Sequence, residues 1–202
     1  RDVLGSRGLG DVYKRQQFGC ISFDKGGYYC IREKDTFSFI RCGRHKDRPA
    51  HADNLHLDIW YQGENCLFDG GSYKYNTTEK LLRYFMGTES HNTIMLEGHD
   101  QMLKGDRFIW YNWSQAEWSS LKETEDTYIF EGKVSCFTYL NKKIKHYRKI
   151  VKWKNTCKWE IEDCIDGNPK NMNMRQLWHT NKDNLSLESN GETIDTEQLC
   201  SN

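Results

Sequence analysis

The chain has 202 residues, which is long enough for one domain with a sizeable core, and β-sandwiches of this length are common. Lysine and arginine together number 29, as do aspartate and glutamate, so the overall charge does not favour nucleic acid or an anionic membrane. Any anionic ligand must therefore be held by a local group of side chains, and no apolar run is long enough to span a bilayer.

The N-terminal stretch RDVLGSRGLGDVYKRQ shows no apolar periodicity. It resembles a translated adapter sequence, and it therefore carries no weight in the prediction of the fold. We expect residues 1–16 to be a non-native or disordered leader and residues 17–202 to form one domain that is truncated at its C-terminus.

The next stretch, FGCISFDKGGYYCIREKDTFSFIRCG, is typical of β-strands, with two strands around a glycine-rich turn at residues 24–27 and a third after Asp35. A polar loop follows at residues 43–49, and loops at strand ends commonly carry binding residues. In this loop, the guanidinium of Arg48 has the donor geometry to hold a sugar carboxylate or sulfate. A solvated loop cation explains Arg48 equally well.

The alternation in residues 51–60 predicts a half-buried strand that begins at His51. One face of this strand carries His51, Asp53, Leu55, Leu57 and Ile59, and the other carries His56, Asp58 and Trp60. From the residues alone, a histidine in the place of His51 is more often a hydrogen-bonded core residue than a ligand. His56 and Asp58 are interpreted as structural or as exposed on the sheet face.

A second strand, NCLFDGG, follows a turn at residues 62–65 and ends at Asp69. A carboxylate beside two glycines can approach a metal closely, although a turn cap explains Asp69 equally well. Residues 77–85, TTEKLLRYF, predict a short helix with a threonine N-cap. The stretch SHNTIMLEGHDQ then predicts a strand that opens with His91.

His51, Asp69 and His91 therefore lie at the edges of separate strand-like runs, where adjacent strands can bring them together. Two imidazole nitrogens and one carboxylate oxygen, completed by water or another protein atom, form a common zinc shell. Asp53, on the same face as His51, is a candidate for an outer hydrogen bond that orients an imidazole.

The remainder of the chain predicts further strands, and the alternation is clearest in HYRKIVKWK, where lysines usually solvate a face or guard an edge. His179 is interpreted as a core or surface residue. The eight cysteines form no C-x-x-C pair and no zinc-ribbon spacing, which favours buried free thiols. Disulfide pairing in an oxidising compartment is the alternative.

Four motifs, HAD-x-L-H-x-D-x-W, D-G-G-x-Y-x-Y-N, S-H-N-T and a closing D-Q, occur in this order. Together they resemble the carboxyl-terminal β-sandwich region of the heparinase II/III-like family of polysaccharide lyases, over roughly residues 18 to 180. The resemblance implies an all-β fold, a large antiparallel, supersandwich-like β-sandwich with one short helix in a loop. It also implies a fragment that lacks the family's α/α-toroid domain, from an intact bacterial protein in the periplasm or outside the cell.

The activity that the resemblance implies is β-elimination on a uronic-acid polysaccharide. In the family, residues that match His51, Asp69 and His91 hold a zinc ion, which we expect to be chiefly structural, and the main acid and base residues lie largely in the toroid. The catalytic residues are therefore unknown here, and we expect the isolated chain to be inactive. The implied partners are an acidic polysaccharide and the missing toroid of the same chain, with no nucleic acid and no membrane.

One departure from the family pattern keeps two alternatives open. Related lyases often carry a second histidine two positions before the metal ligand, and here that position is Pro49. This favours a non-catalytic carbohydrate-binding sandwich as one alternative. The other is a purely structural sandwich whose histidines and aspartates form buried hydrogen bonds. A glycoside hydrolase is disfavoured because no pair of carboxylates stands out as acid and nucleophile.

Overall fold

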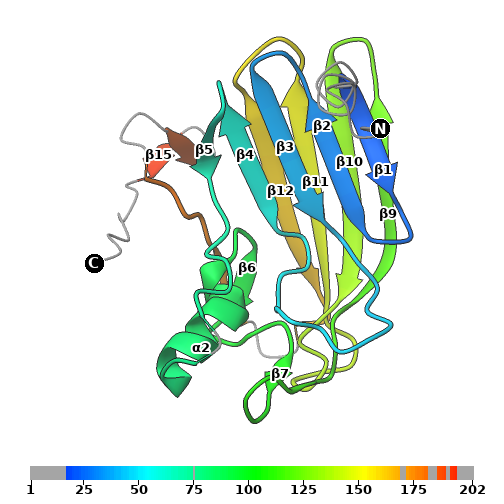
Figure 1. The fold of residues 1–202 in the computed structure, drawn as a ribbon. Coiled ribbons are helices and arrows are strands. Elements are labelled where there is room, and N and C mark those ends of the chain that lie inside the picture. The colour runs from blue at the N-terminus through cyan, green and yellow to red at the C-terminus, as the bar shows by residue number, and fades with distance from the viewer. Residues whose placement is uncertain (1–16, 75, 169–171, 182–185, 190–191, 195–202) are drawn as a thin grey trace, which may run out of the picture.

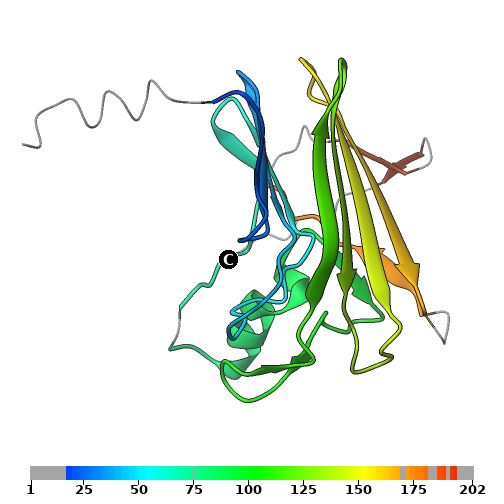
Figure 2. The same cartoon turned by 90° about the vertical axis from the view of Figure 1, so that its right-hand side faces the viewer.

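The structure, a computed structural model, describes residues 17–74, 76–168, 172–181, 186–189 and 192–194, so the expected leader lies outside the described residues. Two antiparallel sheets pack face to face (Figures 1 and 2), which confirms the predicted β-sandwich. The front sheet, which faces the viewer in Figure 1, runs in the order β1 (Gly19–Phe23), β2 (Tyr28–Arg32), β3 (Thr36–Arg41), β4 (Leu57–Tyr61) and β5 (Glu64–Leu67). The back sheet has the order β12 (Trp159–Asp166), β11 (Lys145–Trp153), β10 (Thr127–Ser135) and β9 (Gln115–Glu123).

The smaller elements gather at one end of the sandwich, except for one C-terminal hairpin (Figure 1). They are α2 (Glu79–Met86), the 3₁₀ turn η1 (Thr88–Ser90), β6 (Ile94–Leu96), β7 (Leu103–Lys104), β8 (Trp110–Tyr111), β13 (Met174–Gln176), β14 (Leu187–Ser189) and β15 (Glu192–Ile194). Helix α2 confirms the predicted short helix, and its N-cap Thr78 accepts a hydrogen bond from the backbone N–H of Leu81 at 3.4 Å. No helix within the described residues is long and apolar enough to cross a bilayer.

The front sheet is a meander whose turns follow from local sequence. Phe23 pairs with Tyr28 across the predicted turn, and Gly27 there has a φ of +70°. The β4–β5 turn is shorter than predicted, because only Gln62 and Gly63 form it while the next two residues already pair as strand. Both turn residues have positive φ, 50° and 84°, the geometry that two-residue hairpin loops favour.

The prediction of a strand from His51 is wrong, because β4 begins only at Leu57. Residues 51–56 form a loop in which Leu55 has a φ of 63° and donates its N–H to the carbonyl of Arg41. The side chain of Asn54 is buried in this loop and bonds to the backbone N–H of Gly43 and the hydroxyl of Ser114. These tertiary hydrogen bonds replace strand pairing, and an alternating sequence alone does not reveal them.

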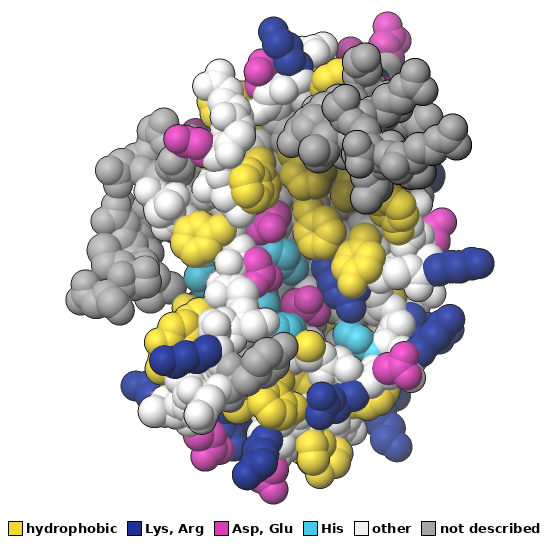
Figure 3. Space-filling view, viewed as in Figure 1, with side chains coloured by type: hydrophobic (Ala, Val, Ile, Leu, Met, Phe, Trp, Pro, Cys, Tyr) yellow, Lys and Arg dark blue, Asp and Glu magenta, His cyan; other side chains and the backbone are white. Residues whose placement is uncertain are grey.

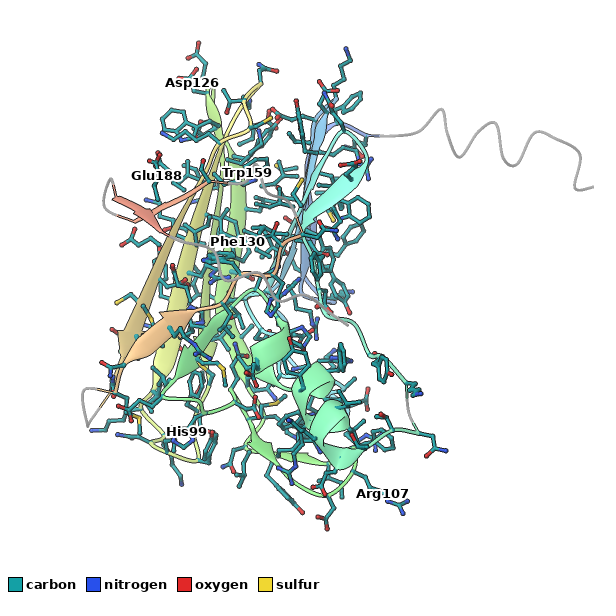
Figure 4. The ribbon with its side chains drawn as sticks, turned by 90° about the vertical axis from the view of Figure 1, so that its left-hand side faces the viewer. His99, Arg107, Asp126, Phe130, Trp159 and Glu188 are labelled. Carbon is teal, nitrogen blue, oxygen red and sulfur yellow. The ribbon has the colours of Figure 1, made fainter. Side chains whose placement is uncertain are left out.

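The core lies between the sheets. The ring of Tyr29 on β2 packs on that of Phe130 on β10 with a centroid separation of 5.0 Å, and Figure 4 shows Phe130 between the layers. The indole N–H of Trp159 on β12 donates to the hydroxyl of Ser38 on β3 at 2.9 Å, so the layers also share a buried polar bond. All seven cysteines within the described residues are free thiols, and burial raises the pKa of Cys42 to about 12.

Strand β11 confirms the predicted alternation, but its inward face carries buried charges. The expectation that its lysines are solvated is wrong for Lys152, which is fully buried. The ammonium of Lys152 donates to the carboxylate of Glu33 in the front sheet's β2–β3 turn at 2.7 Å, and to the carbonyls of Trp153 and Thr156. The ion pair and these carbonyls replace the lost hydration, which is the condition for burying an ammonium group.

A second buried ion pair joins β11 to β12. The guanidinium of Arg148 donates to both carboxylate oxygens of Asp163 at 2.7 and 2.8 Å, and His146 Nε2 lies 2.6 Å from the same carboxylate. Burial alone raises the pKa of Asp163, but the charge and hydrogen bonds of Arg148 outweigh burial and hold that pKa well below its usual range. The same guanidinium also reaches the carbonyls of Leu55 and Asn92, both at 2.7 Å.

Replacing Arg148 by methionine removes the positive partner of a buried carboxylate. We expect Arg148→Met to lower the free energy of unfolding by about 3–5 kcal/mol, because an uncompensated buried charge remains. Lys133→Met is the matched control, since its pair with Asp166 is partly exposed, and we expect less than about 1 kcal/mol there. Urea unfolding of both variants measures the difference, and equal losses would contradict the assigned role of Arg148.

Candidate functional site

Three loops bring His51, Asp69 and His91 together. His51 lies in the β3–β4 loop, Asp69 lies two residues beyond β5, and His91 directly follows η1. His91 Nδ1 is 2.8 Å from Asp69 Oδ2, and His91 Nε2 is 3.3 Å from His51 Nδ1. The three side chains that the sequence singled out are therefore neighbours, but they stand on loops rather than on the strand ends that we predicted.

The loop of Asp69 is held against the loop of His91 at Gly70. The backbone N–H of Gly70 donates to the carbonyl of Ser90 at 3.0 Å. A Cβ atom on Gly70 would stand 2.9 Å from Ser90, so a larger residue would push the two loops apart. The Asp69 carboxylate also accepts the backbone N–H of Gly71 at 2.5 Å. The two glycines after Asp69 thus fix the carboxylate by close approach and by a backbone donor.

His56 joins the cluster, although the sequence did not place it there. Its side chain is buried, and its Nε2 lies 3.1 Å from Asp58 Oδ1 and 3.6 Å from Asp69 Oδ2. His56, Asp69 and His91 each offer one ligand atom, and these atoms lie within 4.8 Å of one another. The prediction that His56 lies on the strand face opposite His51 is wrong, because residues 51–56 form a loop and not a strand.

Asn92, next to His91, connects the loops around the cluster. Its side-chain amide donates to the carbonyls of Leu57 and Phe68 at 2.9 and 3.1 Å. Its side-chain oxygen accepts the backbone N–H of His179 at 2.7 Å, and its backbone N–H donates to Nδ1 of His56 at 2.9 Å. The buried His179 is therefore a structural partner of the site, which decides between the core and surface positions that the sequence left open.

The titratable groups of the site shift one another's pKa values. Burial raises the pKa of Asp69, but the hydrogen bond from His91 and the charges of His91 and His56 outweigh it and hold that pKa well below its usual range. Burial lowers the pKa of His91, but the hydrogen bond and charge of Asp69 outweigh burial, so the pKa is raised overall. Burial, together with the charge of His91, lowers the pKa of His51.

Asp53 does not take the role that we predicted for it. Its carboxylate pairs with the guanidinium of Arg41 at 3.3 Å, and within the described residues it makes no hydrogen bond to an imidazole of the cluster. Ser72 stands in the corresponding place instead, with its hydroxyl 3.0 Å from His51 Nε2. The loop geometry of residues 51–56 explains the difference, because Asp53 does not share a strand face with His51.

Arg48 lies on the surface three residues before His51. Its guanidinium lies 5.9 Å from the ring centroid of Phe108, and it pairs with no carboxylate in the part of the chain that the structure describes. Pro49, which occupies the position where the family resemblance led us to expect a histidine, is buried and has no proton to transfer. The loop thus presents an available guanidinium close in sequence to the cluster.

The cluster adjoins an aromatic surface on the outer face of the front sheet. Trp60 pairs with Phe37 across β3 and β4, and Asp58 pairs with Phe39 two positions along, on the same face of the sheet. Tyr28 stacks on Phe39 with a centroid separation of 5.7 Å. Figure 3 shows hydrophobic side chains over this face, with histidines and acidic groups below them. A ligand that contacts the cluster from this side would also contact aromatic rings.

The donor chemistry of the cluster suits zinc. Zinc–nitrogen bonds of about 2.0–2.1 Å at tetrahedral angles place two ligand nitrogens roughly 3.3 Å apart. The separation of His51 Nδ1 and His91 Nε2 is 3.3 Å, so this pair already has that spacing. Asp69 supplies the carboxylate, but its Oδ2 lies beside His91 Nδ1, on the other edge of the ring from this pair, so the carboxylate would have to turn to become a direct ligand of the same ion. The residues present therefore fit a zinc ion.

The Asp69–His91 pair predicts a pH dependence for the metal-free chain. The raised pKa of His91 contributes stability that is complete below its usual value of 6.5 and is lost as the pH rises through the folded-state pKa. The lowered pKa of Asp69 contributes stability above its usual value of 3.8, which is lost on acidification through the folded-state pKa. Both contributions are complete only between these two usual values.

We therefore expect the unfolding free energy of the chelator-treated wild type to fall more steeply between about pH 6 and pH 9 than that of Asp69→Asn, which lacks the charge on His91. Urea unfolding across this range measures the two slopes. Asp126→Asn, in the β9–β10 turn at the far end of the sandwich (Figure 4), is the control and should keep the wild-type slope. Identical slopes in wild type and Asp69→Asn would contradict the pairing.

Comparisons with known proteins agree with this architecture. The family model described as heparinase II/III-like, C-terminal, matches residues 15–199. A solved structure of heparinase III superposes with a TM-score of 0.66 and 19% identity over 86% of this chain and 25% of its own. The heparan sulfate lyase HepC from Pedobacter heparinus gives 0.51 and 17% over 67% of this chain and 20% of its own. Curated protein sequences give no match.

The chain thus spans about a quarter of the length of the heparinase III that it resembles. At these identities the structural likeness shows the fold, namely the sandwich that the sheets described above form. The match of the family model covers nearly the whole chain, well past the cluster of histidines and carboxylates. The chain belongs to the heparinase II/III-like family, of which it contains the C-terminal β-sandwich.

Proposed function

We propose that this chain is the sandwich portion of a polysaccharide lyase that cleaves a uronic-acid-containing polysaccharide by β-elimination. Membership of the heparinase II/III-like family is the observation that carries this proposal. The reaction removes the proton at C5 of the uronic acid, breaks the C4–O4 bond and leaves a double bond between C4 and C5. A base, an acid for the departing oxygen and positive charge near the carboxylate are its requirements.

The described chain supplies only some of these requirements. No described group stands out as base or acid, because the histidine expected before His51 is Pro49. We therefore propose that the main acid and base come from a toroid domain of the same protein, which pairs with this sandwich across the saccharide cleft. The intact protein would act on an extracellular polysaccharide from the periplasm of a bacterium or after secretion.

We further propose that His51, Asp69 and His91 hold a zinc ion whose role is chiefly structural. When bound, zinc would replace the hydrogen bond between the two imidazoles with shorter, directed bonds and fix the loops of the cluster relative to one another. Loop fixation matters because Arg48 stands in the loop that begins the cluster. The spacing of the two imidazole nitrogens supports this proposal.

Arg48 is the proposed contact for the sugar acid. Its guanidinium is exposed and has no carboxylate partner among the described residues, so its donors are available to a uronate or sulfate group. The aromatic outer face of the front sheet supports contact with sugar rings. A hollow of about 290 Å³ at the β2–β3 turn of this sheet is lined by Trp60 and by Phe37 with Arg32 over its ring, and Glu33, Lys34 and Asp35 add charges of both signs.

Metal analysis tests the zinc site. We expect the purified chain to contain about one zinc ion, and we expect His51→Ala and Asp69→Ala to lose it, because each removes one of only three protein ligands. His99→Ala is the matched control, since the ring of His99 packs on Tyr139 and not on the cluster. Elemental analysis after removal of loosely bound metal gives the ratio. A wild type without zinc would refute the metal site and favour the purely structural alternative.

Binding measurements test Arg48. In the intact protein, Arg48→Ala should weaken binding of an acidic oligosaccharide by roughly 10–100-fold, since a charge-assisted hydrogen bond contributes about 1.5–3 kcal/mol. Arg83→Ala is the control, because Arg83 is an exposed arginine already paired with Glu79 on helix α2. Calorimetric titration compares the two variants. An unchanged affinity in Arg48→Ala would assign Arg48 to the solvated surface instead.

Activity assays separate the roles of the two domains. The isolated chain should generate no unsaturated uronate product from heparin-like, alginate-like or other uronic-acid substrates, whereas the intact protein should. Ultraviolet absorbance of the C4–C5 double bond measures the product. Elimination by the isolated chain would contradict the proposed division of labour. Binding without elimination by the intact protein would favour the non-catalytic alternative that Pro49 allows.

A further inference from the structure

His56 lies close enough to Asp69 and His91 to serve as a ligand, yet the position of its ring protons decides whether it can. A neutral imidazole has one protonated nitrogen and one bare nitrogen, and only a bare nitrogen binds a metal. The partner on the side of the ring away from the metal therefore selects the available nitrogen. In established metal sites that second nitrogen donates its proton to a carboxylate, a carbonyl or water.

The partner of His56 on that side is a donor. The backbone N–H of Asn92 points at Nδ1 of His56 at 2.9 Å, and a backbone N–H can only donate. Nδ1 must therefore be bare, and the proton of the neutral ring sits on Nε2. That nitrogen faces two acceptors, Asp58 Oδ1 at 3.1 Å and Asp69 Oδ2 at 3.6 Å. A metal on Nε2 would require the neutral ring to lose its one N–H proton and become an imidazolate.

In the other two histidines, the donating nitrogen points away from the space between the two rings. Nδ1 of His91 faces the carboxylate of Asp69 at 2.8 Å, so this nitrogen donates its proton there and Nε2 is the nitrogen left to face a metal. Nε2 of His51 faces the hydroxyl of Ser72 at 3.0 Å, and a hydroxyl can accept a proton from it and leave Nδ1 bare. These two nitrogens, His51 Nδ1 and His91 Nε2, stand 3.3 Å apart. In the metal-free chain a proton on His91 Nε2 bridges them, and a metal would take the place of that proton.

Asn92 cannot easily turn its N–H away from His56. Its side chain is held by the carbonyls of Leu57 and Phe68 and by the backbone N–H of His179, and its own carbonyl accepts a hydrogen bond from Arg148. Rotation of the peptide that carries this N–H would also turn the carbonyl of His91 away from the backbone N–H of Thr93, which donates to it at 2.9 Å, and would leave buried groups without partners. The tautomer of His56 is therefore set by the same network that positions the loops.

We infer that His56 is a positioning residue and not a metal ligand. The backbone N–H of Asn92 locks it as an Nε2–H donor, which holds the carboxylate of Asp58 and faces that of Asp69. The inference about the tautomer of His56 depends only on the position of the Asn92 N–H. The statement that His56 stays outside the metal shell rests in addition on the zinc site proposed above.

Two substitutions separate a donor from a ligand. Glutamine places an N–H near the position of Nε2, so we expect His56→Gln to keep about one zinc ion per chain with nearly wild-type affinity. Alanine removes the donor, so His56→Ala should still bind about one zinc at saturation, but roughly 10–100-fold more weakly. His91→Gln is the matched ligand control and should lose the metal. Metal analysis and competition with a chelator give the ratio and the affinity.

Loss of zinc in His56→Gln to the same extent as in His91→Gln, in a variant that keeps the wild-type near-ultraviolet circular dichroism, would overturn the inference. Nitrogen-15 spectra of the metal-free wild type test the tautomer directly, with the His56 signals identified by their absence in His56→Gln. We expect a bare Nδ1 and a protonated Nε2, and the reverse would overturn the inference even if zinc binds. If the wild type binds no zinc, the proposed metal site fails while the spectra still decide the role of His56.

Discussion

The guanidinium of Arg148 is the contact on which both the sandwich and the site depend. It extends from the back sheet and donates to both carboxylate oxygens of Asp163. It also donates to the carbonyls of Leu55 and Asn92, in two loops of the front layer. A buried guanidinium is stable only when its donors are satisfied, and here the acceptors come from the neighbouring strand and from the site loops. The back sheet therefore positions the site without contributing a side chain to it.

Asn92 links Arg148 to the imidazoles by hydrogen bonds. Its carbonyl accepts a hydrogen bond from Arg148, and its backbone N–H donates to His56. Its side-chain amide donates to one carbonyl in β4 and to another in the segment that leads to Asp69. The protonation pattern of the cluster is thus fixed by backbone donors as well as by side-chain chemistry. A backbone donor thus distinguishes His56, whose N–H faces the carboxylates, from His51 and His91, whose ring nitrogens face each other.

The two outer faces of the sandwich differ in a way that matches this arrangement. The back sheet presents ion pairs such as Lys133 with Asp166 and Lys158 with Glu160, which suit a solvated surface. The front sheet presents Trp60, Phe37 and other rings beside the cluster. The back sheet also exposes rings, such as Trp118 packed on Tyr147, so what distinguishes the front face is that its rings lie beside the cluster.

The sequence by itself determined the sandwich, the hairpins of β1 to β3 and helix α2, because alternation, turn residues and an N-cap are local signals. It also singled out His51, Asp69 and His91 through motifs that resemble a known family. Tertiary structure alone decided that residues 51–56 form a loop, that His56 joins the cluster and that Lys152 lies inside. The reason is that these outcomes depend on hydrogen bonds and ion pairs between distant segments, as in Asn92 with His56 and Lys152 with Glu33.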